Sequence, residues 1–383
     1  MNLLGIKKQV NPHVPFDNQL LWTVIGLMVF GLTMVTSASM SFSESNPFFY
    51  TQRELIQLGI SLFLILITLY VPMQRWQQFG TVLLILVIAM LVVVLGIGTS
   101  INGASRWIPL GVFNFQPAEL SKLALFLYLA GYLARKSDEV QSGFWGFFKP
   151  MAIMSILSIL LLLQPDLGTV IVLFMVTIGI LFIAGAKLWQ FIAILSTGIL
   201  TVVSLILFES YRLARLLSFL DPWQDATGSG YQLIASLMAI GSGGLFGQGM
   251  GNSILKLGYL PECHTDFIFS IISEEYGYVG VISLLALLFF LTFKAMAIGY
   301  RALNERVLFS GYLACEIGIW FGFQTFVNIG VTSGMLPTKG LTLPFISYGG
   351  SSLIVMSIAV AILLRIDFEF RRKQAQARIR SIK

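Results

Sequence analysis

Long apolar runs recur along almost the whole of this 383-residue chain, and they constrain its fold more than any other feature. Many of them are long enough to cross the roughly 30 Å hydrocarbon core of a bilayer. Charged residues make up only 11% of the chain, against about 25% in a soluble domain. A membrane span must satisfy its own backbone hydrogen bonds, and runs of this length do so as helices. The chain is therefore predicted to be all-α, a polytopic integral membrane protein.

Ten transmembrane helices are expected, and they divide the chain into three parts. Residues 1–19 form a cytoplasmic segment, 20–364 a ten-helix membrane domain, and 365–383 a basic cytoplasmic tail. The longest connection, 208–265, is predicted to be a large extracytoplasmic loop between spans 7 and 8. The predicted spans cover about residues 20–40, 55–71, 81–98, 118–134, 151–164, 167–184, 188–207, 267–294, 307–330 and 345–364.

The distribution of basic residues sets the orientation. An even number of spans places both termini on one side, and 17 of the 24 basic residues fall on that side. The positive-inside rule then places both termini in the cytoplasm. The basic tail is a candidate for contacts with anionic membrane lipids. Because the net charge of +6 is mostly juxtamembrane, it does not indicate nucleic-acid binding. The seven basic residues on the outer side are Arg53, Arg106, Lys122, Arg212, Arg215, Lys256 and Lys339.

An acidic group lies where the large loop meets the eighth span. Asp266 stands at the start of the apolar helix, with Glu274 and Glu275 about two turns deeper. A charge at bilayer depth costs roughly 2.5–3.5 kcal/mol on insertion scales, so such residues usually mark function. Asp266 could cap the helix or act as a general base, and both roles need an ionised carboxylate. His264, Thr265 and Glu275 are candidate supporting residues.

A second set combines two cations with an acid on the same side. Glu119 and Lys122 are three residues apart at a predicted helix start, so they share a face. One interpretation is an ion pair that lowers insertion cost. The other is a polyanion site, in which Arg106 forks onto phosphate oxygens and Lys122 adds a point charge.

A third set lies before the last span, where Lys339 precedes Ser347, Tyr348, Gly349 and Gly350. These residues could form a re-entrant turn whose hydroxyls satisfy loose backbone groups. They could equally form a polar wall that approaches a sugar or phosphate closely, because glycine lacks bulk.

The absence of several motifs narrows the classes of reaction that the chain could catalyse. The sequence has no CxxC or HExxH zinc motif, no GxSxG nucleophile elbow and no phosphate-binding loop. Buried acids such as Glu316 and Asp166 would suit ion coupling, which keeps a transporter as an alternative. No internal repeat supports the inverted-repeat form of that alternative.

Several motifs in fixed order resemble the SEDS family (shape, elongation, division and sporulation), and its division branch more than its elongation branch. The resemblance runs from the first span to Asp367, with Cys263 standing where alanine is expected. The motifs are NGASRWIPLG, FQPAELSKL, QPDLGT, GSGYQ, GQGMGNS, LPECHTDFIF, SEEYGYVG and GMLPTKGLTLPFISYGGSS.

The resemblance implies a peptidoglycan glycosyltransferase that polymerises lipid II into β-1,4 glycan at the division septum by an inverting mechanism. Asp266 falls on the family's essential aspartate, which we interpret as the general base. Arg106, Glu119, Lys122 and Lys339 fall on positions lining the family's central cavity. A lipid II flippase, an elongation-type polymerase and a non-catalytic scaffold are the alternatives.

The resemblance also implies partners in the bacterial inner membrane. A class B penicillin-binding protein would supply transpeptidation, together with other membrane proteins of the division machinery. No soluble cofactor is expected, and a divalent cation, Mg²⁺ or Mn²⁺, is left open.

Overall fold

The computed structural model describes residues 16–42, 46–101, 104–109, 114–194, 221–228, 230–337 and 340–382, together with 196, 198 and 219. The seventh predicted span lies largely outside these residues, as does much of the first part of the large loop. Helical residues at 188–194 mark where that span begins.

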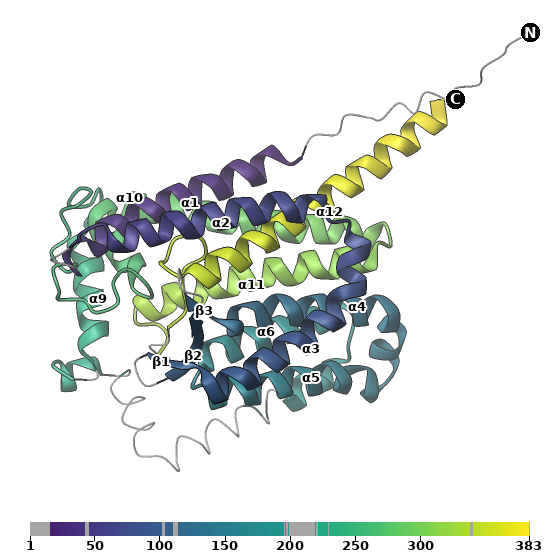
Figure 1. The fold of residues 1–383 in the computed structure, drawn as a ribbon, viewed down its shortest axis with the longest axis horizontal. Coiled ribbons are helices and arrows are strands. Elements are labelled where there is room, and N and C mark those ends of the chain that lie inside the picture. Colours follow the sequence, from purple (N-terminus) through teal and green to yellow (C-terminus); the bar gives the residue numbers. More distant parts are fainter. Residues whose placement is uncertain are drawn as a thin grey trace, which may run out of the picture.

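Long helices dominate the described residues, and most of them run side by side along the longest axis of the molecule (Figure 1). Each of the other nine predicted spans overlaps one of these helices, although the ends differ by several residues. By length and apolar composition alone, five of the helices (α1, α2, α3, α5 and α10) could cross a membrane. The protein is therefore a multi-pass helical membrane protein. The helices are α1 (Asn18–Ser39), α2 (Phe49–Tyr70), α3 (Met73–Ile97), α4 (Pro117–Ser142), α5 (Phe144–Leu163), α6 (Leu167–Ile183), α10 (Ile268–Asn304), α11 (Leu308–Thr332) and α12 (Gly350–Ile382).

Short elements gather toward one end of these helices (Figure 1). A small antiparallel sheet has the strand order β1-β2-β3, which the all-α prediction omitted. The sheet pairs backbone groups in the connection between α3 and α4, and those groups would otherwise need another partner. The short elements are η1 (Met40–Phe42), β1 (Thr99–Ile101), β2 (Ala104–Pro109), β3 (Asn114–Phe115), η2 (Pro222–Asp225) and α9 (Tyr231–Ser242).

Ion pairs gather at the opposite end, where α12 projects beyond the bundle (Figure 1). Asp17 precedes α1 and pairs with Lys294 at 3.0 Å and with Arg371 at 3.1 Å. The ring of Phe16 stacks on that of Phe368. These contacts bind the start of α1 to α10 and to the basic part of α12, so the predicted tail continues the last helix.

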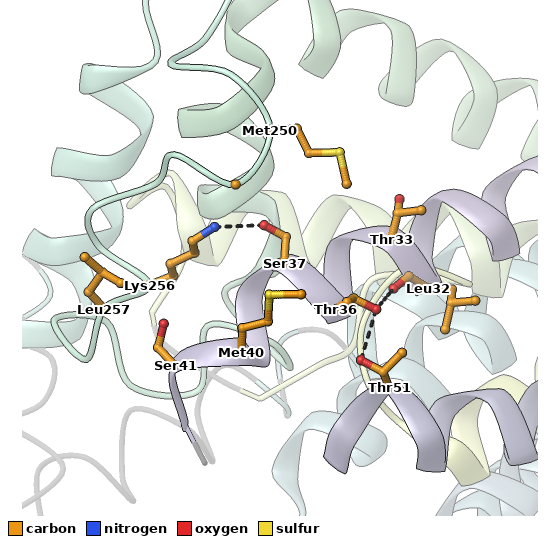
Figure 2. A pocket seen from close by; sticks show the side chains of 11 residues that line it. Leu32, Thr33, Thr36, Ser37, Met40, Ser41, Thr51, Met250, Lys256 and Leu257 are labelled. Atoms are coloured by element: carbon orange, nitrogen blue, oxygen red, sulfur yellow. Dashed lines mark hydrogen bonds between the residues drawn. The ribbon is translucent and has the colours of Figure 1, made fainter. Parts of the chain in front are cut away.

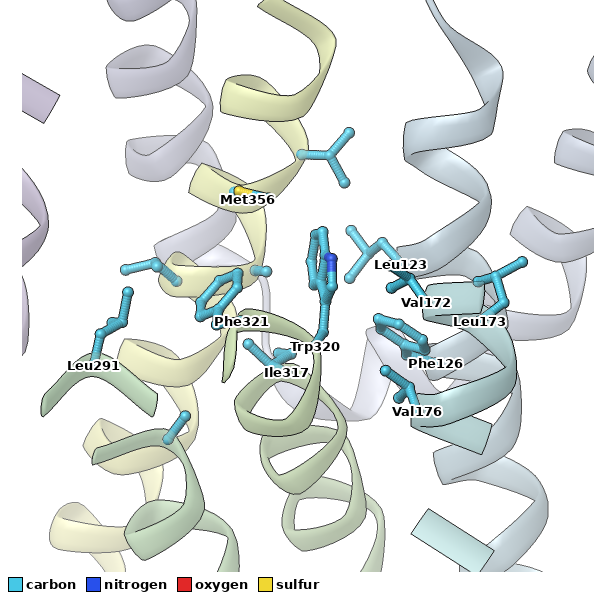
Figure 3. Packing of buried hydrophobic residues seen from close by; sticks show 14 of the residues in the cluster. Leu123, Phe126, Val172, Leu173, Val176, Leu291, Ile317, Trp320, Phe321 and Met356 are labelled. Carbon is cyan, nitrogen blue, oxygen red and sulfur yellow. The ribbon is translucent and has the colours of Figure 1, made fainter. Parts of the chain in front are cut away.

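The bundle interior is close-packed around an aromatic centre on α11. Trp320 is fully buried, and its ring centroid lies 5.6 Å from that of Phe126 on α4. Val172 and Val176 of α6 border the same centre (Figure 3). Lipid tails are as apolar as these side chains, so shape-dependent van der Waals packing holds the helices together rather than escape from water.

Helix α10 is broken about a quarter of the way along, at Gly277. Gly277 has φ 64° and ψ −165° inside the helix, a conformation that favours glycine. The break exposes backbone groups that pair with the preceding loop: Tyr278 N–H donates to Gly244 O at 2.9 Å, and Gln248 N–H donates to Glu274 O at 2.9 Å. The glycine-rich loop at residues 244–249 is thus fastened to the N-terminal part of α10, the helix that follows Asp266.

Candidate active site

Asp266 lies on the loop that leads into α10. Phe267 is the N-cap of that helix and no side chain caps it, so the interpretation of Asp266 as a helix cap is wrong. The Asn328 side-chain amide, on α11, donates to Asp266 O at 2.9 Å and to Leu341 O at 2.7 Å. The carboxylate packs against Gly340, where an added Cβ would come within 2.4 Å of Oδ2. Two loops far apart in sequence therefore meet at this carboxylate.

The surroundings of Asp266 favour its protonated form more than water does. The pKa of Asp266 is raised to about 7, mainly by burial; the charges of Glu262 and Asp166 also raise it, and the charge of Arg106 lowers it. A carboxylate with a pKa near neutral can both accept a proton and release it at physiological pH. Asp266 is therefore suited to general-base chemistry.

Arg106 belongs to the surroundings of Asp266. It projects from β2 and donates from Nε to Gln164 O at 2.8 Å and from Nη2 to Pro165 O at 2.6 Å. A guanidinium carries five N–H donors, so this anchoring does not exhaust it. The next residue, Asp166, caps α6 by accepting from Thr169 N–H at 3.1 Å. Strand β2 and the start of α6 are thereby joined beside Asp266.

Lys122 and Glu119 form a separate, buried pair on α4. Lys122 is 0% exposed, and its Nζ lies 2.8 Å from Glu119 Oε2 and 5.2 Å from the Trp320 ring centroid. Its Nζ also lies 3.4 Å from Gln324 Oε1. The Gln324 Nε2 group in turn donates to Thr342 O at 2.8 Å. The pair therefore connects through Gln324 to the same loop that touches Asp266.

The third predicted set closes this loop over the start of α12. Ser347 Oγ accepts from Leu343 N–H at 2.7 Å, and Tyr348 N–H donates to His264 O at 2.9 Å. An added Cβ at Gly350 would meet the Gln57 side chain at 2.3 Å. Gly349 packs in the same way on Thr342, 3.1 Å from an added Cβ. Lys339 lies outside the described residues.

His264 and Thr265 take different positions beside Asp266. The His264 ring centroid lies 4.5 Å from that of Tyr50 and 5.6 Å from that of Tyr348. Burial lowers the pKa of His264, although the charge of Glu262 raises it. The Thr265 hydroxyl donates to Glu262 Oε2 at 3.0 Å.

Glu275 belongs to another cluster. Its Oε1 lies 2.7 Å from Lys256 Nζ and accepts from Ser37 Oγ at 2.7 Å. Lys256 and Ser37 also border a cavity of about 640 Å³ between α1, α2 and the loop before residue 258 (Figure 2). The contacts of Glu275 thus hold the loop that carries Lys256 against α1. The other lining residues are Leu32, Thr33, Thr36, Met40, Ser41, Thr51, Met250, Gly251 and Leu257.

Among the described residues the protein alone builds no metal site, because no group of three or more His, Cys, Asp and Glu side chains could hold an ion. Mg²⁺ commonly binds through one or two carboxylates together with substrate phosphates, so the divalent cation stays a hypothesis.

Two polar residues of this site were missed in the sequence, Gln324 and Asn328. They are four residues apart on α11, so they share one face of an apolar helix. The signal available in the sequence was a pair of amide side chains at this spacing within an apolar run.

Comparison with known proteins identifies the family. A family model described as cell cycle protein, of the FtsW, RodA and SpoVE type, matches residues 18–372. The probable peptidoglycan glycosyltransferase FtsW of Escherichia coli O6:H1 is 55% identical over 98% of this chain and 91% of that protein. The protein of the same name from Aeromonas salmonicida is 54% identical over 96% of this chain and 94% of that protein.

Solved structures of two proteins have folds similar to that of this chain. A structure on the coordination of polymerization and crosslinking by a peptidoglycan synthase complex has a TM-score of 0.79 at 29% identity, covering 94% of this chain and 99% of that one. The rod shape determining protein RodA of Thermus thermophilus has a TM-score of 0.69 at 29% identity, over 92% and 97% of the two chains. This chain therefore belongs to the FtsW, RodA and SpoVE family of cell cycle proteins, the SEDS family that its motifs indicated.

Proposed function

We propose that this protein is a peptidoglycan glycosyltransferase that polymerises lipid II into glycan at the division septum, with Asp266 as its general base. The relatives at more than 50% identity bear the name of that enzyme. The observation that carries the proposal is the position of Asp266. Its half-buried carboxylate has a pKa of about 7 and lies where the outer loop, Gly340 and the field of Arg106 meet.

The reaction joins two lipid-linked disaccharides. The donor sugar is α-linked to pyrophosphate and the glycan is β-1,4 linked, so the acceptor oxygen attacks C1 on the face opposite the pyrophosphate. The acceptor 4-hydroxyl forms the new C1–O bond while its proton passes to the Asp266 carboxylate. The C1–O bond to pyrophosphate breaks, and its electron pair leaves with the phosphate. The site must therefore supply a base on one face and positive charge on the other.

The three basic residues of the proposed site contribute differently to that positive charge. Arg106 is fixed by two backbone carbonyls, which pre-orients its guanidinium for a phosphate. The charge of Lys122 is neutralised by Glu119. The pair therefore contributes a dipole, oriented by Glu119, and not a net positive charge. Lys339, proposed from its motif position alone, would add a further positive charge for the pyrophosphate. The polar turn from Ser347 to Gly350 would form the wall against the sugar.

The membrane arrangement follows from the same proposal. Ten spans would place both termini in the cytoplasm and the site at the outer face of the inner membrane. There the lipid tail stays in the bilayer while the sugars reach the polar loops. A class B penicillin-binding protein and other division proteins would bind this chain, since a similar fold occurs in a peptidoglycan synthase complex.

One feature favours a second candidate, lipid II translocation. Glu316 is 0% exposed in the middle of α11, and neither of its carboxylate oxygens has a hydrogen-bond partner within the described part of the chain. Acids at such positions are typical of ion-coupled transport.

The test is polymerisation of labelled lipid II by the purified protein with its transpeptidase partner, comparing the wild type with Asp266→Asn. We expect long glycan from the wild type and a rate about 10²- to 10⁴-fold lower from the variant, the usual size of a general-base effect. Wild-type rates from a folded variant would refute the base assignment. Absence of polymer from both proteins, together with lipid II translocation in proteoliposomes, would favour the transporter.

A further inference from the structure

Asn328 links the two loops that form the site. It is 2% exposed on α11, and its Nδ2 group donates to Asp266 O at 2.9 Å and to Leu341 O at 2.7 Å. One turn earlier on the same face, Gln324 Nε2 donates to Thr342 O. Helix α11 therefore holds two consecutive residues of the 340–342 loop, and Asn328 alone of the two amides also reaches the Asp266 loop.

We propose that Asn328 is a positioning residue for glycosyl transfer, which fixes the Asp266 carboxylate in the place where it meets the acceptor hydroxyl. This inference rests on the proposed function of Asp266. Asn328 does not touch the reacting atoms; it acts through the backbone of Asp266.

The geometry around Asp266 explains why such a residue is needed. Two backbone bonds of this turn are local, because Thr265 N–H and Phe267 N–H both donate to Glu262 O, at 3.1 Å and 3.4 Å. A third, from Tyr348 N–H to His264 O at 2.9 Å, fastens the turn to the start of α12. These bonds do not join Asp266 itself to the 340–342 loop, whereas the Asn328 amide does. The close packing of Oδ2 on Gly340 depends on the distance between Asp266 and that loop. A displacement of about 1 Å in a reacting group can lower a rate roughly 10²-fold.

The remaining atom of the amide argues against a purely structural role. Asn328 Oδ1 is buried and has no hydrogen-bond partner among the residues described here. An incompletely satisfied buried amide is unfavourable, and an apolar side chain with the same branched skeleton, such as leucine, would not carry that cost. The two donated bonds are then the reason for an amide at this position.

The experiment measures kcat and KM for lipid II polymerisation by the full-length protein with its transpeptidase partner. Asn328→Leu removes both donated bonds while keeping the branched skeleton of the side chain. Asn328→Asp keeps the shape but presents oxygen to both carbonyls, and it serves if the leucine variant fails to fold. Thr332→Val is the control one turn further along, because the Thr332 hydroxyl donates only to carbonyls of its own helix.

We expect kcat to fall about 10- to 100-fold in a folded Asn328 variant, with KM within about twofold of the wild type and Thr332→Val unchanged. A kcat within twofold of the wild type would overturn the inference, as would a rise in KM at constant kcat, which would indicate substrate binding. Asp266→Asn is measured in parallel. If it polymerises normally, the proposed function of Asp266 fails; if it is inactive while Asn328→Leu is normal, only the positioning role fails.

Discussion

At the scale of single residues, the site is built as much by close backbone approach as by charge. Gly340 leaves room for the Asp266 carboxylate, and Gly350 leaves room for Gln57. Charge matters less directly at Lys122, because its ammonium group is enclosed by Glu119 and Trp320. Breaking a buried ion pair by removing one partner is expected to cost about 3–5 kcal/mol. Loss of activity on substitution of Lys122 would therefore need a stability measurement beside it.

Gly340→Ala tests the contact with the base. The new Cβ would lie 2.4 Å from Asp266 Oδ2, so the carboxylate must move. We expect polymerisation to fall about 10²-fold, the size of effect known for a displaced reacting group, with thermal stability nearly unchanged. The matched control is Gly59→Ala on α2, where an added Cβ meets nothing within 4 Å. Equal activities in the two variants would contradict the contact.

Part of this site was predictable from the sequence. Asp266, Arg106, Glu119 and Lys122 stood out because charged residues are rare in an apolar chain. Asn328 and Gln324 did not, because a neutral amide in a span is ambiguous until its partner on a distant loop is known. The sequence also grouped Arg106 with Lys122, whereas the structure places Arg106 with Gln164 and Pro165.

At the scale of elements, the break in α10 joins the glycine-rich loop at residues 244–249 to the helix that follows Asp266. Sequence periodicity predicted one continuous span, since the residues on both sides of Gly277 are helix-compatible. The break requires backbone pairing with residues 244–249, and such long-range pairing leaves no local signal beyond the glycines themselves. The observed ends of the helices also differ from the predicted ends of the spans, because polar turns extend helices such as α3 and α12 beyond the apolar runs.

Gly277→Ala tests that break. Its Cβ would lie 2.3 Å from Gly247 N, and the backbone has positive φ. We expect destabilisation of about 1–3 kcal/mol from backbone strain alone, measured as a lower Tm in detergent, together with faster proteolysis of the outer loop. Gly26→Ala, on an open face of α1, should leave both unchanged. A Tm equal to that of Gly26→Ala would show that the break is not strained.

At the scale of the whole molecule, the two ends of the bundle differ in chemistry. One end gathers the ion pairs of Asp17, Lys294 and Arg371, and the other gathers glycine-rich loops, the small sheet and Asp266. The apolar runs and the basic residues predicted this polarity, because both depend on composition rather than on contacts. The packing of helices around Trp320 could not be predicted, since similar apolar side chains allow many arrangements.

Thiol labelling in cells tests the orientation. Tyr259→Cys places a thiol at an exposed position of the outer loop, and Lys136→Cys places one at the opposite end. The native Cys263 and Cys315 are buried, so they should add little background. A membrane-impermeant reagent should label Tyr259→Cys in intact cells whose outer barrier is permeable to it, and Lys136→Cys only after the inner membrane is opened. The reverse pattern would overturn the orientation.

The central claim, that Asp266 acts as the general base, is tested most directly by the pH dependence of kcat/KM for lipid II polymerisation. Burial raises the pKa of Asp266 to about 7, and a base acts in its ionised form. The logarithm of kcat/KM should therefore rise by about one per pH unit below pH 7 and level off above it. A profile that stays flat from about pH 5 to pH 9 would contradict the account.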